Sequence, residues 1–412
     1  MPPGFPTMRS DPAPGGRGAD PVTRLAVVTT HPIQYQCPIW RNLAARPNVL
    51  VKVFFASDFS VRGYIDPGFS QQVRWTVPLL DGYEHEFLGS GPVGPRTTGP
   101  MIGATSLANR LRSFAPTACL LNAYSPLLYW HALAACRLEG IPVMLRAETT
   151  DVDQDRTLLR RLRRDAALKV FYAGVSRFLA IGHNSRAHYE RLGVRGERIG
   201  FAPYCVDSDL FESQYARRQR GFIRSQLAIP PNALLVLFSG KLIPKKDPLT
   251  LLDAVAGVPD VHGRPVHLVF LGDGDLRGQL EQAAAATAAG RVHFLGFQQQ
   301  EKLGDVYTDA DMLVLPSLYT ETWGLVVNEA MQFGLPCIVS DRVGCGADLI
   351  RPGDTGYVFP HGEGAALRSA LRALSDQVLV RRDAIHALCR ERVAGYSVQT
   401  AADGILDNAL HL

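Results

Sequence analysis

The chain has 412 residues, of which 46% are hydrophobic and 20% charged, and its formal net charge at pH 7 is +4. This balance is typical of a globular protein, and the length is sufficient for two domains of ordinary size. No apolar run reaches the about 18 residues of a membrane-spanning helix. The seven cysteines are scattered, without a Cys-x-x-Cys pair, which argues against a disulfide framework and a zinc site and fits a reducing cytoplasm.

The first part of the chain predicts a short extension followed by an α/β domain. Residues 1–22 are rich in proline and glycine and lack an apolar segment, which favours a disordered extension over a signal peptide. From residue 23 to residue 205, short apolar runs alternate with helical stretches, as in repeated βαβ units. The expected strands are 25–28, 49–55, 118–121, 142–145, 178–181 and 199–203, and the expected helices are 36–45, 127–138 and 185–192.

A second series of the same kind begins after a strand-free bridge at about residues 204–231. Two such series predict an α/β fold of two doubly wound domains with parallel sheets, residues 23–205 and 206–395, and a ligand in the cleft between them. The expected strands of the second series are 234–239, 266–271, 292–295, 312–316 and 337–340, and its expected helices are 249–255, 276–289, 303–307 and 324–334.

The most informative segment, residues 319–336, places two glutamates around the start of a short helix. Glu321 precedes the helix in a strand-end loop, where ligands of open α/β sheets bind, and Glu329 lies one to two turns inside the helix. The first-turn amides of Gly324 and Leu325 suit a phosphate or diphosphate. A carboxylate at Glu329 can accept two hydrogen bonds from a ribose diol. The segment therefore indicates a sugar-nucleotide site, although ordinary helix charges can produce the same spacing.

The loop after the first strand of the second series brings basic side chains to the same edge of the sheet. Gly240 begins a turn, and Lys241, Lys245 and Lys246 follow. Lysines at a strand end can clamp a diphosphate and neutralise the charge of a leaving group. A solvated basic loop is the alternative. The nearby segment 272–278 has the spacing Gly-x-Gly-x3-Gly, which differs from the dinucleotide fingerprint and argues against NAD.

The pattern Glu-x7-Glu followed by Ala-Met-x-x-Gly-x-Pro resembles the donor-site signature of retaining GT-B glycosyltransferases of family-4 type (glycosyl transferases group 1). The resemblance implies two Rossmann-like domains that face each other across a cleft. It also implies a C-terminal helix, residues 396–412, that crosses back to the first domain. In that family the first glutamate contacts the donor sugar and the second contacts the ribose, and these roles carry over to Glu321 and Glu329.

Two further loops carry the same resemblance. Lys241 and Lys246 match the family's Gly-Arg/Lys-x4-Lys element. Lysine replaces the commoner arginine at the first position, so bidentate binding is lost there, and Lys245 could compete with Lys246 for the second. The backbone at Phe297 resembles the family's nucleobase contact.

The resemblance is diffuse in the first domain. The loop 29–35 takes the place of a family loop that is often glycine-rich, and His31 in it is either a cleft residue or a structural one. Arg146 and Glu148 occupy the region where related enzymes hold acceptor-side residues. Asp151-Val-Asp153 matches a metal-binding Asp-x-Asp by letter. It lies in the first domain, away from the expected donor phosphates, so no metal is expected.

A basic segment, Arg156–Arg177, carries seven basic residues against one acid, Asp165, so its net charge is +6. Leucines interleave with these charges, which predicts a basic amphipathic helix. An anionic membrane surface or a phosphate-bearing acceptor would suit such a helix, and a solvated helix face is the alternative. Nucleic acid is not expected, because no base-reading motif accompanies the segment.

The residues and the resemblance together predict a retaining hexosyltransferase of polysaccharide biosynthesis. It would move a sugar from a nucleoside-diphosphate donor to a glycan, lipid-linked or small-molecule acceptor, without a cofactor. The alternatives are a sugar-nucleotide epimerase on the same fold and a non-catalytic sugar-nucleotide-binding protein. The expected location is the cytoplasm, with peripheral attachment to the inner face of the membrane if the basic segment binds lipid. The expected catalytic residues are Glu321, Lys241 and Lys246, and the expected donor-binding residues are Glu329, Gly324, Leu325, Gly240 and Phe297.

Overall fold

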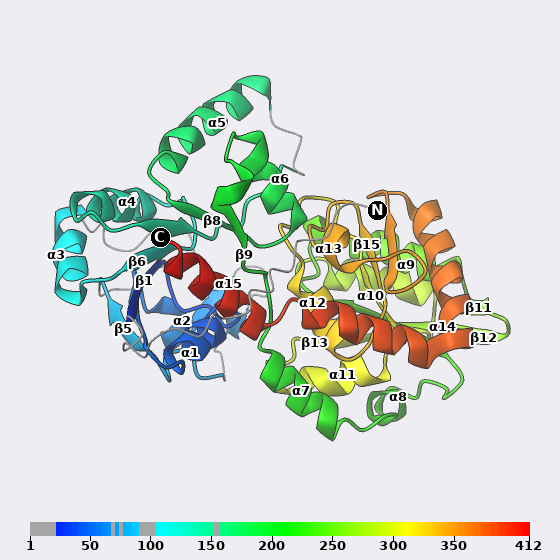
Figure 1. Cartoon of the computed structure of the whole chain (residues 1–412). Coiled ribbons are helices and arrows are strands. Elements are labelled where there is room, and N and C mark those ends of the chain that lie inside the picture. The colour runs from blue at the N-terminus through cyan, green and yellow to red at the C-terminus, as the bar shows by residue number, and fades with distance from the viewer. Residues whose placement is uncertain (1–21, 67–70, 74–76, 90–103, 152–156) are drawn as a thin grey trace.

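The computed structural model describes residues 22–66, 71–73, 77–89, 104–151 and 157–412. The predicted N-terminal extension lies outside these residues except for residue 22, and so do Asp153 and Arg156. Figure 1 shows two α/β domains beside each other, with the C-terminal helix lying against the first. The sheets confirm the predicted fold class of two doubly wound, largely parallel domains.

The first domain is built on a sheet in which every neighbouring pair of strands is parallel. In its centre, Leu25 pairs with Val51 on one side and with Ala118 on the other. Within the described residues the strand order is β5 (Glu84–Phe87), β2 (Val49–Phe55), β1 (Thr23–Thr29), β6 (Ala118–Leu121), β7 (Val143–Leu145), β8 (Arg177–Ala180) and β9 (Ile199–Phe201).

Helices cover both faces of this sheet. Successive side chains of a strand point to opposite faces, so both faces are apolar and both need a cover. Leu25 and Val27 join an apolar cluster with α1 (Cys37–Ala44) and α15 (Val398–Leu410). Ala26 and Val28 join a second cluster on the other face. The helices of that second face are α3 (Ala104–Phe114), α4 (Leu128–Leu138), α5 (Leu158–Tyr172) and α6 (His183–Arg191). The domain also contains α2 (Phe59–Arg62), the hairpin β3 (Tyr64–Asp66) and β4 (Gln71–Val73), and the short η1 (Gly196–Arg198).

The second domain repeats this plan on a sheet that is parallel except for one short edge strand. Its order is β11 (Asp260–Val261), β12 (Arg264–Leu271), β10 (Leu234–Ser239), β14 (Met312–Leu315), β15 (Cys337–Ser340) and β16 (Gly356–Phe359), and β13 (Val292–Gly296) also pairs with β12. The helices are α9 (Pro248–Ala256), α10 (Arg277–Thr287), α11 (Leu303–Asp309), α12 (Leu325–Gln332), α13 (Gly346–Leu349) and α14 (Gly364–Ala394), with η2 (Pro244–Lys246) and η3 (Gln300–Lys302) in the loops.

The structure also contains elements that the apolar pattern does not predict. The edge strand β5 has the sequence Glu-His-Glu-Phe, which lacks the apolar alternation of a half-buried strand. The strand β16 and the helix α3 are further additions. An edge strand needs little apolar sequence, because its pairing with β2 is carried by backbone groups.

A buried arginine fixes the connection between the domains. The Arg146 guanidinium donates from Nε to the Ala202 carbonyl (2.9 Å) and from Nη2 to the Pro203 carbonyl (2.5 Å). It also lies over the Tyr204 ring, 5.4 Å from its centroid. The connection continues into α7 (Ser208–Arg217) and α8 (Phe222–Gln226). The predicted acceptor-side residue Arg146 is therefore held by the chain's own backbone, and we assign it a positioning role.

A second junction centres on Asp348, which is fully buried in α13 of the second domain. Its carboxylate accepts hydrogen bonds from the His183 amide (3.1 Å) and from the Tyr396 hydroxyl (2.9 Å), and the His183 imidazole lies 2.7 Å away. His183 begins α6 of the first domain, so the first-turn amide and the imidazole of one domain meet a buried acid of the other. The chain then leaves α14, passes Tyr396 and ends with α15 on the first domain.

We expect the substitution Arg146→Met to lower the free energy of unfolding by about 1–3 kcal/mol, because two buried carbonyls lose their donors. Urea denaturation followed by circular dichroism measures this change. The matched control is Arg137→Met, which alters an exposed arginine on α4 of the same domain. Equal stabilities of the two variants would show that other contacts hold the connection.

Candidate donor-binding and active site

Glu321 lies in a loop whose backbone is fixed by the neighbouring loop after β15. The Glu321 amide donates to the Arg342 carbonyl, and the Gly344 amide donates to the Glu321 carbonyl, both at 2.9 Å. A Cβ at Gly344 would lie only 2.0 Å from the Thr322 carbonyl oxygen. Glycine is therefore required at residue 344 for the two loops to lie this close.

The Glu321 carboxylate forms an ion pair with a lysine from another loop. Lys246 Nζ lies 2.5 Å from Glu321 Oε2, and Lys245 Nζ lies 3.9 Å from the same atom. The Lys246 and Glu321 side chains are 15% and 19% exposed, whereas Lys245 is 44% exposed. Of the two lysines that compete in sequence, Lys246 is the one drawn into the site, and Lys241 precedes η2 in the same loop.

The helix α12 begins at the predicted anion-binding position. Gly324 is its N-cap, with φ +99°, and Leu325 is its first residue. A Cβ at Gly324 would lie 2.9 Å from Val343 Cγ1 and 3.1 Å from Leu315 Cδ2, so both the conformation and the packing favour glycine. The amides of the first helical turn lack partners within the helix and carry the positive end of its dipole, which suits a bound phosphate.

Glu329 lines a cavity of about 180 Å³ together with two other predicted donor-binding residues, Gly240 and Phe297. The Tyr307 hydroxyl donates to Glu329 Oε2 at 2.7 Å. Removal of the carboxyl from bulk water raises the pKa of Glu329 from 4.5 to about 7, and the Tyr307 hydrogen bond opposes the rise. Gln34 of the first domain lines the same cavity, which therefore lies between the domains.

Backbone contacts among the strand-end loops form the floor of this cavity. The Gly240 amide donates to the Leu271 carbonyl, and the Gly272 amide donates to the Gly296 carbonyl, both at 2.9 Å. Gly272 has φ +134°, and a Cβ there would lie 2.0 Å from the Gly240 carbonyl oxygen. The segment that resembles a dinucleotide fingerprint thus permits close packing of two loops under the cavity.

In the first domain, Glu148 belongs to a polar chain that faces Glu321. The Tyr35 hydroxyl donates to Glu148 Oε1 at 3.1 Å, and the Tyr204 hydroxyl donates to Tyr35 Oη at 3.1 Å. Part of the Glu148 side chain is accessible to solvent. Protein atoms nevertheless surround most of its carboxyl group, and the resulting desolvation raises the pKa of Glu148. The negative charge of Glu321 adds to the rise, so carboxylates from the two domains face each other in the cleft.

His31 follows β1 and is half-buried. Thr30 Oγ1 lies 2.9 Å from His31 Nδ1, and desolvation lowers the pKa of His31 to about 4. The imidazole is therefore neutral at pH 7 and can accept or donate one hydrogen bond through each ring nitrogen.

The first aspartate of the Asp-x-Asp match, Asp151, is bound by basic side chains of the protein. The Asp151 carboxylate lies 2.6 Å from Arg191 Nε and 2.9 Å from His188 Nδ1, so its charge is already compensated. Its partner Asp153 lies outside the described residues, and the absence of a metal stays a prediction.

In the described part of the chain, none of the helices has the length and apolarity to cross a membrane.

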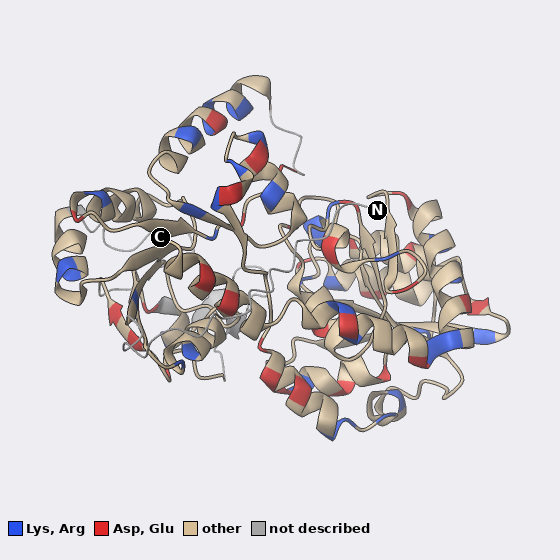
Figure 2. Ribbon diagram, in the orientation of Figure 1, with Lys and Arg blue, Asp and Glu red and all other residues tan. Residues whose placement is uncertain are grey.

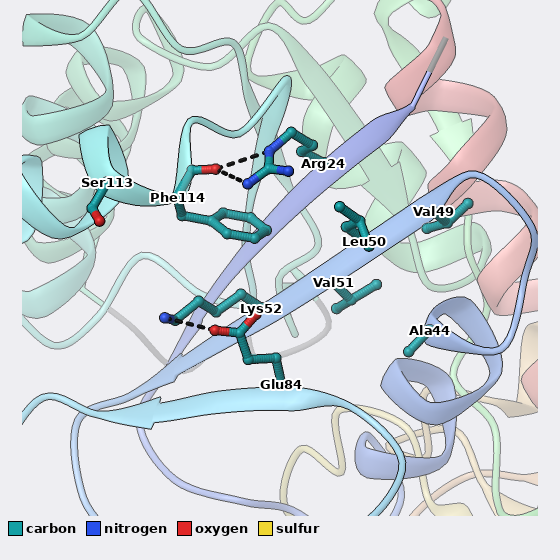
Figure 3. Close-up of a pocket in the computed structure, with 9 residues that line it drawn as sticks. All are labelled: Arg24, Ala44, Val49, Leu50, Val51, Lys52, Glu84, Ser113 and Phe114. Carbon is teal, nitrogen blue, oxygen red and sulfur yellow. Dashed lines mark hydrogen bonds and ion pairs between the residues drawn. The ribbon is translucent and has the colours of Figure 1, made fainter. Parts of the chain in front are cut away.

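A separate hollow lies at the amino end of the first sheet (Figure 3). Its charged side chains are engaged within the protein: Arg24 Nε donates to the Phe114 carbonyl at 2.9 Å, and Lys52 Nζ lies 2.9 Å from Glu84 Oε1. Open α/β sheets bind their ligands at the opposite, carboxyl end of the strands. We therefore assign the ligand site to the cleft cavity.

The sequence patterns do not reveal three polar residues of the site. Tyr307 lies in a helix and shows no motif, yet its hydroxyl holds Glu329. Gln34 and Tyr35 lie in the loop already noted for His31, where the residue types alone give no signal. Among the described residues, Gln34 Oε1 has no hydrogen-bond partner although it is shielded from solvent beside the cavity.

The raised pKa of Glu329 predicts how its replacement changes stability with pH. Between pH 4.5 and 7 the folded chain binds a proton that the unfolded chain releases, so this carboxyl stabilises the fold at low pH. The contribution is lost as the pH rises through 7. The melting temperature of Glu329→Gln, relative to that of the native chain, should therefore increase between pH 4.5 and 7 and stay constant above pH 7. Glu391→Gln, an exposed site on α14, is the control and should show no such trend. A constant difference for Glu329→Gln would contradict the assigned pKa.

Comparisons with known proteins bear on the family and the fold. Residues 219–387 match the family model described as Glycosyl transferases group 1. A D-inositol 3-phosphate glycosyltransferase of Nocardia farcinica is 31% identical over 254 residues, which is 60% of this chain and 54% of that protein. The chain thus spans about half the length of the first curated relatives that it matches.

Two solved structures share the overall fold. Anabaena HepE in complex with UDP has a TM-score of 0.70 and 18% identity, with 95% of this chain and 100% of that chain covered. Sucrose-phosphate synthase from Thermosynechococcus elongatus has a TM-score of 0.70 and 21% identity, with 94% and 99% covered. The protein therefore has the GT-B fold, and its residues 219–387 are similar to the glycosyl transferases group 1.

Proposed function

We propose that the protein is a retaining hexosyltransferase that uses a nucleoside-diphosphate sugar. The observation that carries the proposal is the cleft cavity, which Gly240, Phe297 and Glu329 line together. The Lys246–Glu321 ion pair comes from the adjoining loops. The family match and the UDP-bound structural neighbour support the same class of donor.

Each part of the donor has a suited partner in this proposal. The base lies against the backbone at Phe297, and the ribose diol is bound by Glu329, which Tyr307 orients. The diphosphate lies at the first turn of α12, near the amides of Gly324 and Leu325. Lys241 and Lys246 supply the positive charge that the leaving diphosphate needs.

The sugar is then placed between the glutamates of the two domains. Glu321 binds its hydroxyl groups from the second domain, and Glu148 faces it from the first. Retention follows if the acceptor oxygen attacks the anomeric carbon from the side that the diphosphate leaves. The bond from the anomeric carbon to the diphosphate oxygen breaks, the bond to the acceptor oxygen forms, and the acceptor proton passes to the departing diphosphate. This route needs neither a strong general base nor a metal.

The acceptor in this proposal is a glycan, a lipid-linked sugar or a small molecule of polysaccharide biosynthesis. The first-domain residues that would contact the acceptor or the donor sugar are Glu148, His31 and Gln34, since all three lie in loops at the carboxyl edge of the first sheet. The proposed setting is the cytoplasm, at the inner face of the membrane.

The donor assignment is tested with a panel of UDP, GDP, ADP and their sugars, measured by thermal shift and calorimetry. We expect one nucleoside diphosphate to raise the melting temperature, and we expect Glu329→Ala to weaken its binding by about 1.5–3 kcal/mol, the usual value for hydrogen bonds to a charged group. Mass spectrometry of products with candidate acceptors then identifies the transferred sugar. Absence of binding by the whole panel, or conversion of the donor without acceptor, would reject a transferase.

The two neighbouring lysines provide a matched pair for the chemical step. Lys246→Met should lower kcat by about 10²–10³, because a charge beside the leaving group is lost in a water-poor site. Lys245→Met removes a more exposed charge 3.9 Å from the same carboxylate and should change kcat by at most about fivefold. Steady-state kinetics on the donor identified above compares them. Equal losses would assign the role to the loop's total charge instead of to Lys246.

A further inference from the structure

The helix α5 presents one face to the protein and an apolar face to solvent. Its inward face is formed by Leu168, Phe171 and Tyr172, which are buried in the first domain, and the Phe171 ring packs on Trp130 with centroids 4.9 Å apart. In Figure 1, α5 projects at the margin of the first domain, away from the second sheet. Among the described residues, the remaining side of the helix is exposed to solvent.

The outward side carries large apolar residues at helical spacing. Leu159, Leu162, Ala166 and Val170 recur every three or four residues, so they form one stripe along a helix of about 3.6 residues per turn. The exposed fractions are 57% for Leu159 and Leu162 and 67% for Val170, and Leu158 at the start of the helix is 72% exposed. Such a stripe costs free energy in water and usually marks an interaction surface.

Basic side chains accompany the stripe. By helical position, Arg163 and Lys169 lie on its two borders. Arg160 and Arg161 lie in the first turn outside the stripe, and Arg161 is on the same line of the helix as Leu168. All four are exposed, and among the described residues none of them has a recorded ion pair. Figure 2 shows this basic character along α5. The outer side of α5 thus combines apolar and positive groups.

The acid of the helix is used elsewhere. Asp165 is bound by Arg191 of α6, whose Nη1 lies 2.6 Å from Asp165 Oδ2, and Arg164 turns toward the same group of charges. The only acidic residue of α5 is therefore neutralised on the inner side, and no described carboxylate reduces the positive charge of the outer side.

We propose that the outer side of α5, defined by Leu158, Leu159, Leu162, Val170 and the four exposed basic residues, docks on an anionic lipid surface. The apolar stripe would enter the boundary between headgroups and acyl chains, while the arginines and Lys169 remain at the level of the lipid phosphates. Each basic residue near such a surface contributes to binding, and salt weakens this contribution.

Charge and composition favour lipid over two other partners. A second copy of the chain, packed symmetrically through the same stripe, would bring the basic residues of both copies together without carboxylates between them. A nucleic acid would use the charges but would gain nothing from exposed leucines, since the stripe lacks the aromatic residues on which bases stack. An anionic bilayer uses both features at once.

The docking surface is close in sequence to the cleft. Only residues 149–157 separate Glu148 from the start of α5. If the proposed glycosyl transfer is correct, a docked α5 would hold the acceptor side of the cleft near the membrane, where a lipid-linked acceptor presents its sugar. This consequence rests on the proposed function, whereas the docking itself does not.

The test is co-sedimentation of the full chain with vesicles of phosphatidylcholine alone and of phosphatidylcholine with about 30% phosphatidylglycerol. We expect binding to the anionic vesicles only, with at least about a tenfold loss of partitioning in the variant Arg160→Gln/Arg161→Gln/Arg163→Gln. The variant Leu159→Ser/Leu162→Ser/Val170→Ser should lose binding to a similar extent. Val380→Ser, which alters a residue that is 87% exposed on α14, is the matched control and should bind like the native chain.

Three outcomes would overturn the proposal. They are no binding to anionic vesicles, unchanged binding by the Leu159→Ser/Leu162→Ser/Val170→Ser variant, and a dimer in solution that dissociates in this variant. Far-ultraviolet circular dichroism and nucleotide binding are measured for every variant. A variant that binds nucleotide but not vesicles separates loss of docking from loss of fold. Conversely, vesicle binding without any nucleotide binding would reject the proposed function and leave the docking surface intact.

Discussion

The buried carboxylate of Asp348 is the contact on which the relation of the two domains depends. It accepts a hydrogen bond from the amide of His183, the first residue of α6, and it lies beside the imidazole of the same residue. It also accepts a hydrogen bond from the hydroxyl of Tyr396, which lies between α14 and α15. A buried charge is stable only when it is paired and hydrogen-bonded. Because its partners come from both domains, satisfying this charge also fixes how the domains face each other.

That arrangement determines what the cleft contains. Gln34, Tyr35 and Glu148 come from loops of the first sheet, and they meet Glu329 and Glu321 of the second only because the sheets present their carboxyl edges to each other. Within the cleft, the two second-domain glutamates have different electrostatic partners. Glu321 is paired with Lys246, whereas Glu329 is held by a neutral tyrosine and has a pKa of about 7. Environments that set like groups apart in this way are characteristic of functional sites.

The same physical rules explain why α5 differs from the rest of the surface. Its inner side is satisfied by apolar packing and by the charge network around Asp165 and Asp151. Its outer side keeps leucines and arginines together in water. Elsewhere on the described surface, large exposed apolar residues such as Leu50 and Val380 are spread among other elements. The concentration on one helix is what distinguishes a docking surface from ordinary surface composition.

The sequence alone determined the fold class and the similarity of the second domain to a known family. Continuous apolar runs identified most strands, because buried parallel strands are apolar on both faces. The Glu-x7-Glu segment with its Ala-Met-x-x-Gly-x-Pro continuation pointed to glycosyl transferases group 1, whose family model matches residues 219–387. The edge strand β5 escaped because backbone pairing, and not apolar sequence, holds it. The tertiary structure alone decided which of two adjacent lysines meets Glu321, that Arg146 clamps the interdomain connection, and that Tyr307 holds Glu329. These facts depend on distances between residues far apart in the chain, and a linear pattern carries no information on such distances until packing and charge pairing fix them.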